Sequence, residues 1–306
     1  MLVTVAICTW NREKFLDRCL QNMRELVIPN GIDWELIVVN NSSTDHTDDV
    51  LSRHAANLPL RQLWEPNQGK SHALNTATVA ARGELILWTD DDVLVDPLWL
   101  VEYVSAARSM PDASFFGGPI HPLFEGQLPR WIQEAWPWVS SAYAERNLGN
   151  ECFEFDDETH AFGANFAVRT SVQSRYRYNT QLGRVGVADV RGEETEMQIR
   201  MLRDDLCGRW IPTARVTHLI PTERMTLDHI RRFYFGIGEA YAVMNDTSRL
   251  ADWQRVWCRS RLWSRVFTTT LKYQYLRLIG KSGKWARYFT RSSFLRGRLR
   301  SLSAPT

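Results

Sequence analysis

Three consecutive carboxylates, Asp90-Asp91-Asp92, are the residues of this chain best suited to do chemistry. They end an apolar run, residues 85–88, that is typical of a buried strand. Carboxylates so close raise one another's pKa unless a cation or hydrogen bonds offset the repulsion. Oxygen ligands favour Mg²⁺ or Mn²⁺ over zinc, and magnesium sites often combine one or two carboxylates with substrate phosphates. The triplet therefore indicates a metal site for a nucleotide diphosphate, with a solvated turn before a helix near Asp96 as the alternative.

Strand-like and helix-like segments alternate over the first hundred residues. Apolar, β-rich runs cover residues 2–8, 35–39, 60–64 and 84–88, and helical spacing covers residues 13–26, 45–54 and 71–81. Repeated β-α units predict a mainly parallel sheet with helices on both faces, in which ligands bind outside the carboxyl ends of the strands. We expect four polar loops to line one crevice, because each follows a strand: Thr9-Trp10-Asn11, Asn40-Asn41-Ser42, Asn67-Gln68-Gly69-Lys70 and Asp90-Asp91-Asp92.

The second half of the chain departs from this repeat at about Phe115. Its prolines and the cluster of Trp131, Trp136 and Trp138 indicate an ordered, Trp-rich region, although tryptophans packed in a core give the same pattern. Residues 161–168 resemble a strand with a glycine where a ligand or a backbone approaches closely. We expect helices over residues 193–202, whose acidic first turn suits the helix dipole, and 226–244.

Composition describes an ordinary globular protein of 306 residues with 44% hydrophobic content. The five cysteines are scattered and form no Cys-x-x-Cys pair, which fits a reducing compartment and argues against a structural zinc site. The first eight residues are too short for a signal peptide and lack its basic start, and no window of about 18 apolar residues predicts a transmembrane helix. We therefore expect a cytoplasmic protein.

The net charge of +2 hides a basic tail. Residues 249–300 hold 14 Lys or Arg and one acid, Asp252, a local charge of +13 that leaves −11 for the rest of the chain. Aromatic side chains lie between these basic residues, a mixture that suits an anionic membrane surface. A helical subdomain with a solvated basic face, nucleic acid and a partner protein are the alternatives, and nucleic acid is the least favoured. Peripheral attachment to the inner face of the membrane is the expectation.

Taken in order, these segments resemble the family 2 glycosyltransferases over roughly residues 2–230. One match of this kind would be weak, but several in the right order are hard to obtain by chance. The similar segments are Val5-Ala6-Ile7-Cys8-Thr9-Trp10-Asn11-Arg12, Val38-Val39-Asn40-Asn41-Ser42-Ser43-Thr44-Asp45, Asn67-x-Gly69-x-x-x-Ala73-x-Asn75, Ala81-Arg82-Gly83-Glu84 with the Asp triplet, Glu193-Glu194, and Val216-Thr217-His218.

The resemblance implies an α/β fold of the GT-A type, a mostly parallel sheet flanked by helices with a helical C-terminal extension. It implies a domain over residues 1–225, with a donor half (1–114) and an acceptor half (115–225), and an extension over residues 226–306. The implied activity is metal-dependent, inverting transfer of a sugar from a nucleotide-sugar, with UDP favoured, to a hydroxyl acceptor. The basic aromatic tail is similar to that of members that work at membranes, on lipid-linked or surface glycans.

The resemblance also implies the metal ligands. Asp92, with Asp90 or Asp91 beside it, would hold the Mn²⁺ or Mg²⁺ that bridges the nucleotide diphosphate, and a cation there stabilises the charge of the leaving group. We assign Asp90 and Asp92 to the metal and Asp91 to the nucleotide. His218 is a further candidate ligand, with a structural role as its alternative.

Glu194 is the candidate catalytic base, because an inverting transfer needs one carboxylate to remove the proton of the acceptor hydroxyl. The family usually has Asp at this position, and the longer Glu keeps Glu193 and Glu196 in contention. Acids that merely stabilise a helix N-terminus are the structural alternative.

The remaining candidates belong to the nucleotide. Thr9, Trp10 and Asn11 stand in the family's nucleotide-binding opening, where an indole can stack on any base. Asn41 stands where the family often has an Asp that accepts a uracil N–H, and an amide offers both a donor and an acceptor. Lys70 is placed to approach the phosphates, or is a solvated lysine at a helix start.

Three other functions are consistent with parts of the sequence. A sugar-phosphate nucleotidyltransferase would need a Gly-rich phosphate loop after the first strand, and residues 8–11 contain no glycine. A dinucleotide-dependent oxidoreductase is disfavoured because the same loop lacks G-x-G-x-x-G. A non-catalytic nucleotide- or membrane-binding protein is disfavoured by the presence of the acidic triplet and Glu194.

Overall fold

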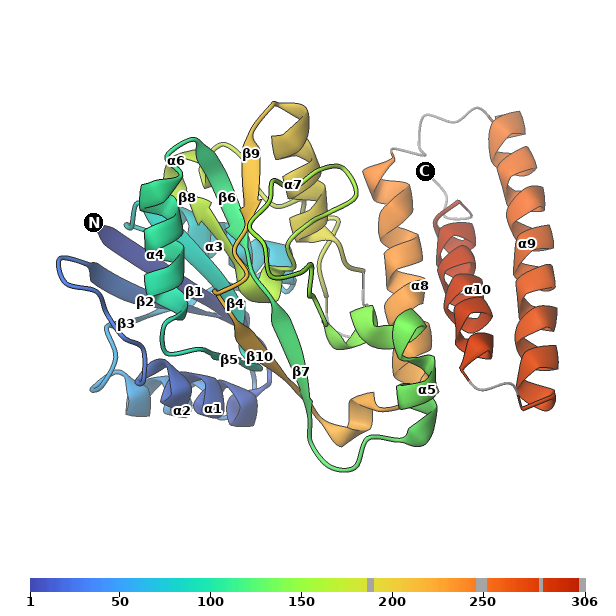
Figure 1. Ribbon diagram of the computed structural model, residues 1–306, viewed down its shortest axis with the longest axis horizontal. Helices are drawn as coiled ribbons and strands as arrows, with labels where there is room; N and C mark the ends of the chain where they lie inside the picture. Colours follow the sequence, from blue (N-terminus) through green and yellow to red (C-terminus); the bar gives the residue numbers. More distant parts are fainter. Residues whose placement is uncertain (186–189, 246–251, 281–282, 303–306) are drawn as a thin grey trace. The chain divides into compact units, whose positions relative to one another are not determined.

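The computed structural model describes residues 1–185, 190–245, 252–280 and 283–302 (Figure 1). Arg249 and Lys281 of the predicted basic tail, and the side chain of Trp253, lie outside the described residues. The chain forms two compact units. The first comprises Met1–Leu123, Ala144–Thr180 and Glu193–Leu219, and the second comprises Phe124–Tyr143, Gln181–Gly192 and Ile220–Thr306. Division of the chain at residues 114 and 225 stays a prediction.

The first unit is built on a seven-stranded sheet with the order β3-β2-β1-β4-β8-β6-β9. β1, β2, β3 and β4 run parallel, β8 is antiparallel to both of its neighbours, and β6 and β9 are parallel. The predicted α/β fold with a mostly parallel sheet is therefore confirmed. The strands span Leu2–Thr9 (β1), Asp33–Asn40 (β2), Leu60–Trp64 (β3), Leu85–Asp90 (β4), Ala113–Gly117 (β6), Phe166–Arg169 (β8) and Cys207–Trp210 (β9).

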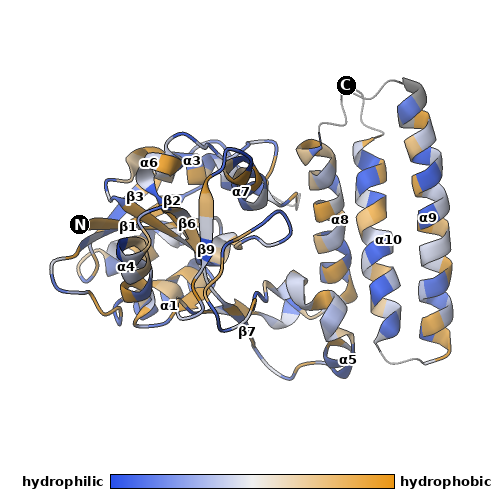
Figure 2. Cartoon of the chain, turned by 45° about the horizontal axis from the view of Figure 1, so that its top comes forward, coloured by the Kyte–Doolittle hydropathy of each residue, from blue (hydrophilic) through white to orange (hydrophobic). Residues whose placement is uncertain are grey.

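Side chains that alternate along the strands pack against two layers of helices. On β1, Val3, Val5 and Ile7 pack toward one layer and Ala6 toward the other, as the two-residue period of a strand requires. The strands at the centre of the sheet are correspondingly hydrophobic (Figure 2). One layer consists of α1 (Glu13–Met23), α2 (Thr47–His54) and α4 (Trp99–Ser109), and the other includes α3 (Lys70–Ala80) and α7 (Glu193–Arg203).

A second, three-stranded sheet has the order β5-β10-β7. Its strands are β5 (Val93–Val95), β10 (Val216–Ile220) and β7 (Ile120–Phe124). Antiparallel pairing places His218 opposite Val93, directly after the acidic triplet. This register is what brings a residue from late in the chain to the carboxyl end of β4.

One predicted strand, residues 161–168, is wrong in its first half. Gly163–Asn165 form a 3-10 turn (η2), and β8 begins only at Phe166. Asn165 is fully buried, and its side chain contacts three other segments: its Oδ1 accepts from Trp99 and Tyr103 of α4, and its Nδ2 donates to the carbonyls of Pro119 and Ala214. These side-chain contacts, which no local pattern reports, fix the turn. The short helix α6 (Thr170–Gln173) follows β8.

The second unit is helical, as predicted for the C-terminal region. Its helices are α5 (Arg130–Val139), α8 (Leu227–Met244), α9 (Asp252–Leu278) and α10 (Lys284–Ser301), with 3-10 turns at Ser140–Tyr143 (η1) and Thr222–Arg224 (η3). Gly238 of α8 and Gly297 of α10 let the two backbones approach, because a Cβ at either position would collide with a carbonyl of the other helix. Trp136 stacks on Tyr143 in the core of this unit. Across the described residues, no helix combines the length and apolarity that crossing a bilayer requires.

Candidate active site

Arg12 holds two of the three acidic side chains in a buried cluster within the first unit. Asp91 and Asp92 form the turn between β4 and β5 and are only 3% and 2% exposed. The two terminal nitrogens of Arg12 lie 2.6 Å from Asp91 and 2.6 Å from Asp92, one on each carboxylate. Two carboxylates this deeply buried would be costly without a cation. A guanidinium with its planar fork suits that bridging geometry.

The electrostatics of this cluster follow from burial and pairing. Burial raises the pKa of Asp91 to about 6, although Arg12 and a hydrogen bond from Thr9 act in the opposite direction. Burial would lower the pKa of Arg12, but Asp91 and Asp92 more than offset it and hold that pKa above its usual range. Thr9 donates from its hydroxyl to Asp91 at 2.8 Å, and Nε2 of His218 lies 3.1 Å from Asp92. The cluster therefore joins β1, β4 and β10.

Lys70 forms the centre of a second, more accessible cluster. Its ammonium lies 2.8 Å from Glu194, 3.2 Å from Asp90 and 3.4 Å from Glu193. Burial alone would lower the pKa of Lys70, but Asp90 and the two glutamates raise it well above its usual range, so the lysine stays charged. The Asp90 side chain is 29% exposed, in contrast to Asp91 and Asp92. Asp90 is thus the most exposed Asp of the triplet, and Lys70 joins it to the acidic pair of α7.

Glu194 owes its position to the start of α7 and to a glycine. Met197 and Met201 pack the helix against the sheet, and its first turn carries the acids that the helix dipole favours. Gly163 lies against Glu194, and a Cβ at position 163 would collide with its carboxylate. A close approach at a glycine of residues 161–168 is observed, but the neighbour is a protein side chain and not the predicted ligand or backbone. Glu196 instead pairs with Arg200, at 2.8 Å.

The loops after β1 and β2 are tied together. Asn11 adopts a left-handed backbone with φ 51°, and its Oδ1 accepts from the backbone N–H of Thr44 at 2.7 Å. Trp10 lies next to it, partly exposed, and its buried indole N–H has no hydrogen-bond partner among the described residues. A buried donor of this kind usually finds a partner, so a ligand could satisfy it.

Asn41 is committed to the protein itself. Its Nδ2 donates to the carbonyls of Glu65 and Asn67, and its Oδ1 accepts from the N–H of Gly69 at 2.8 Å. The amide therefore shapes the loop that leads into Lys70. Gly69 has φ 141°, which L side chains rarely adopt, so the loop needs both residues.

The available ligands fit a metal ion whose coordination shell the protein supplies only in part. Within the described ranges, no group of three His, Cys, Asp or Glu side chains is close enough to bind a metal ion. Asp92 and His218 are neighbours, and Asp90 lies apart from them on Lys70. Such a set fits an ion that takes one or two protein ligands and completes its shell with phosphate oxygens and water.

The predicted residues are thus brought together at the carboxyl ends of β1, β2 and β4 and the start of α7. Sequence reasoning missed Arg12, which it quoted only as part of a motif, and the side-chain contacts of Asn165. The position of Arg12, just after the first polar loop, is a signal, but nothing local names its partners 79 and 80 residues away.

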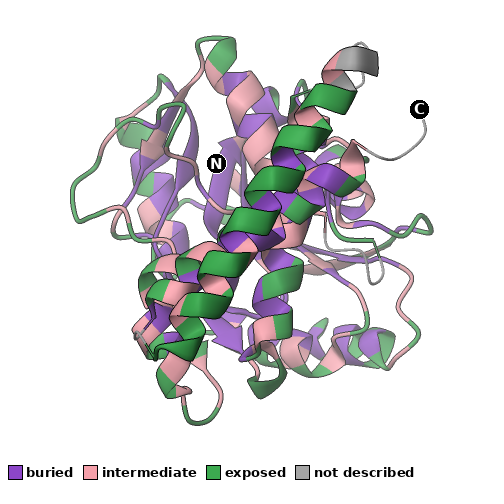
Figure 3. Cartoon of the chain, turned by 90° about the vertical axis from the view of Figure 1, so that its right-hand side faces the viewer, coloured by how far each residue is buried: buried purple, intermediate pink, exposed green. Residues whose placement is uncertain are grey.

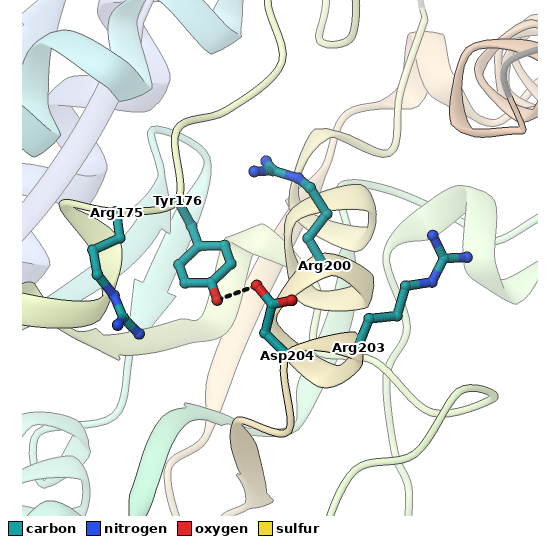
Figure 4. A pocket seen from close by; sticks show the side chains of 5 residues that line it. All are labelled: Arg175, Tyr176, Arg200, Arg203 and Asp204. Carbon is teal, nitrogen blue, oxygen red and sulfur yellow. Dashed lines mark hydrogen bonds between the residues drawn. The ribbon is translucent and has the colours of Figure 1, made fainter.

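A surface hollow of about 460 Å³ lies at the far end of α7 and contains none of the predicted residues. Arg175, Tyr176, Arg200, Arg203 and Asp204 line it (Figure 4). Tyr176 donates from its hydroxyl to Asp204, and Arg200 is already paired with Glu196. The hollow carries net positive charge, but it is separate from the acidic clusters described above.

Comparison with known proteins gives one family and several relatives. The model of the family described as Glycosyl transferase family 2 matches residues 4–176. Validoxylamine A glucosyltransferase of Streptomyces hygroscopicus subsp. limoneus is 32% identical over 113 residues, which is 36% of this chain and 24% of that protein. The chain spans no more than about a third of the lengths of the curated relatives that it matches.

Two solved structures share the fold. The mannosyltransferase PcManGT from Pyrobaculum calidifontis, in complex with GDP-Man and Mn²⁺, has a TM-score of 0.64 at 18% identity and covers 98% of this chain and 87% of that one. Residues 1–349 of TarS from S. aureus, in complex with UDP-GlcNAc, have a TM-score of 0.57 at 13% identity, with 97% and 89% covered. At these identities the likeness establishes the fold alone.

Proposed function

The chain belongs to glycosyl transferase family 2, and on that premise we propose that it transfers a sugar from a nucleotide-sugar to a hydroxyl acceptor with inversion. The observation that carries the proposal is the Lys70 cluster. It joins Asp90, at the carboxyl end of β4, to Glu194, at the start of α7, through one ammonium group. An acid at the nucleotide end of the sheet and a candidate base are thereby held side by side.

Glu194 is the proposed catalytic base. Its carboxylate would accept the proton of the acceptor hydroxyl as that oxygen attacks the anomeric carbon. Lys70 keeps the carboxylate oriented, and its charge reduces the repulsion that a diphosphate would meet from three neighbouring acids. Glu193 is almost fully buried and 3.4 Å from Lys70, which favours a supporting role. Glu196 is the weakest candidate because its side chain is bound to Arg200.

We propose that one or two of the predicted ligands Asp90, Asp92 and His218 hold Mn²⁺ or Mg²⁺, with phosphate oxygens and water completing the shell of the ion. When bound, the ion would stabilise the negative charge of the diphosphate leaving group as a Lewis acid. Arg12 and His218 orient the Asp92 carboxylate, and Lys70 orients that of Asp90. Support for a divalent ion comes from this oxygen-rich donor set.

The nucleotide is proposed to bind over Thr9, Trp10, Asn11, Asn41, Lys70 and Asp91. Trp10 offers an indole face for the base and an unpaired N–H. Asn41 would act by shaping the loop, because contact of its Oδ1 with the nucleotide would replace the hydrogen bond that it accepts from Gly69. UDP is the favoured nucleotide by family resemblance. The two structural neighbours are described with UDP-GlcNAc and GDP-Man, so GDP is the nucleotide to test against UDP.

The acceptor is proposed to be a glycan, free or lipid-linked, at the surface of an anionic membrane on its cytoplasmic side. The support is the charge of residues 249–300, which hold 14 basic residues and one acid.

Matched Glu to Gln substitutions test the proposed base. Glu194→Gln should lower acceptor transfer by about 10²-fold to 10⁴-fold while donor binding is retained, because the amide cannot accept the proton. Glu196→Gln makes the same change two residues away in the same helix and should keep most activity. The assay is product formation from a panel of nucleotide-sugars with Mn²⁺. Full transfer by Glu194→Gln would exclude it as the base, and no turnover of any donor by the wild type would favour a non-catalytic binding protein.

A further inference from the structure

The outer face of α9 exposes a stripe of large apolar side chains. Val256, Trp263, Phe267, Leu271 and Leu278 recur at spacings of seven, four, four and seven residues, which places them on one side of the helix. Their exposed fractions include 60% for Trp263, 64% for Phe267 and 85% for Leu278. Trp257 and Tyr275 extend the stripe on one side, and both are more than half exposed. Figure 3 shows this exposed face along the long helix that crosses the front of the view.

The opposite face of α9 is already occupied. Leu262 and Val266 are buried and form a small core with Leu295 and Leu299 of α10. Thr270 and Ser292 share a hydrogen bond of 2.9 Å between the same two helices. The apolar stripe is therefore a second hydrophobic face, additional to the one that holds α9 in the helical unit.

Basic residues flank the stripe on both sides. With 100° of rotation per residue, Arg259 and Arg277 lie beyond one edge and Arg261, Arg265 and Lys272 lie beyond the other, and all five are exposed. No acidic residue occurs between Trp253 and Arg300. The described residues of α10 that are exposed are all basic: Lys284, Arg287, Arg291, Arg296 and Arg300. The borders of the stripe are thus cationic, and the exposed residues of α10, which packs on the other face of α9, add further positive charge.

We propose that this face of α9 binds an anionic lipid surface, with the helix lying in the plane of the interface. The proposal specifies the membrane contact of the proposed transferase and rests on that function only for its biological purpose. Aromatic side chains on a helix with flanking arginines are the pattern of interfacial helices, in which the rings enter the headgroup region and the cations contact lipid phosphates. Figure 2 shows hydrophobic and hydrophilic residues interspersed along α9, and an apolar stripe bordered by charged residues fits a helix that lies on a membrane.

Charge complementarity favours lipid over the other occupants. A second copy of this chain would bring a stripe with the same basic borders, so its arginines would face arginines. Nucleic acid would use the basic residues but would leave the stripe of Val256, Leu271 and Leu278 in water. An anionic bilayer would remove the apolar stripe from water and contact the basic residues at the same time.

Vesicle sedimentation without donor or metal tests the proposal. The full chain should bind vesicles of phosphatidylcholine with phosphatidylglycerol at moderate salt, and bind vesicles of phosphatidylcholine alone much more weakly. Phe267→Asp should lower the partition coefficient at least about tenfold more than Thr268→Asp, which adds the same charge one residue, and 100°, away. Replacement of Arg261 and Arg265 by Ser should cost roughly fivefold each on anionic vesicles, as expected for single charges near such a surface.

The remaining outcomes overturn the proposal. It fails if the wild type ignores anionic vesicles, if Phe267→Asp and Thr268→Asp bind equally, or if light scattering shows a dimer that Phe267→Asp dissociates while vesicles are not bound. Circular dichroism confirms that each variant is folded. Asp92→Ala should bind vesicles like the wild type, so loss of transfer and loss of membrane binding are separable.

Discussion

The two units of this protein differ in where their charged side chains lie, buried in one and exposed in the other. In the first unit, Asp91 and Asp92 are buried and each is held by Arg12. In the second unit, the basic residues of α9 and α10 are mostly exposed and have few acids near them. A buried pair is expensive to break, whereas an exposed charge costs little to remove. Buried charges should therefore control folding and chemistry, and exposed charges should control where the protein binds.

The largest effect is expected from Arg12→Met. The change leaves two buried carboxylates without their cation, so we expect the free energy of unfolding to fall by about 3–5 kcal/mol. Urea denaturation measures it. Arg53→Met is the matched control, because Arg53 pairs with Asp17 at 3.1 Å on the surface, with side chains 63% and 47% exposed. Arg53→Met should lower the free energy of unfolding by less than about 1 kcal/mol. Equal losses in the two variants would contradict the contrast between the units.

The pH dependence of stability should carry a contribution from Asp91. Its pKa is raised from 3.8 to about 6 in the folded protein, so the native state binds the proton more tightly than the unfolded chain. This stabilisation is complete below about pH 4 and is lost as the pH rises through 6, by up to about 3 kcal/mol. The wild type minus Asp91→Asn difference in unfolding free energy, measured from pH 4 to 7, should decline accordingly. A difference that rises with pH would show that pairing with Arg12 outweighs burial.

Lys70→Met sharpens the comparison within the active site. Without the ammonium, Asp90, Glu193 and Glu194 repel one another and a diphosphate, so we expect kcat/KM to fall by about 10²-fold, equivalent to about 3 kcal/mol. The acidic limb of the pH–rate profile should also move to higher pH, because a nearby positive charge is lost. A variant with an unchanged profile would place Lys70 outside the catalytic machinery.

The parts of this structure that were predictable are those that local patterns encode. The alternation of apolar runs predicted β1 to β4 and the helices between them, because strand and helix periodicities are read within a few residues. The ends of those strands then placed Thr9, Asn41 and Asp90 at one edge. The strand predicted over residues 161–168 was wrong in its first half because long-range bonds of Asn165 fix the turn there.

The pairing within the site depends on tertiary packing. Lys70 and Glu194 are 124 residues apart and meet because α3 and α7 pack on the same face of the sheet. Arg12 is one of many arginines in the sequence, and only the fold selects it as the partner of Asp91 and Asp92. Sequence motifs therefore identified the acidic residues, whereas tertiary packing determines which basic side chain pairs with each of them.

The smallest effect on catalysis is expected from the exposed charges of α10. Arg287→Ser and Arg291→Ser should change the unfolding free energy by less than about 0.5 kcal/mol each and leave transfer to a water-soluble acceptor unchanged. Thermal unfolding and initial rates measure both quantities. A large loss of rate in either variant would mean that the helical unit takes part in the chemistry.

Nucleotide binding tests the central claim most directly. We would record melting temperatures of the wild type and Asp90→Asn with UDP, GDP and their sugars, with and without Mn²⁺, because a ligand selective for the native state raises the melting temperature. The account predicts a Mn²⁺-dependent increase with one nucleoside diphosphate and its sugar, reduced in Asp90→Asn. No increase with any nucleotide in a folded sample that contains Mn²⁺ would contradict it.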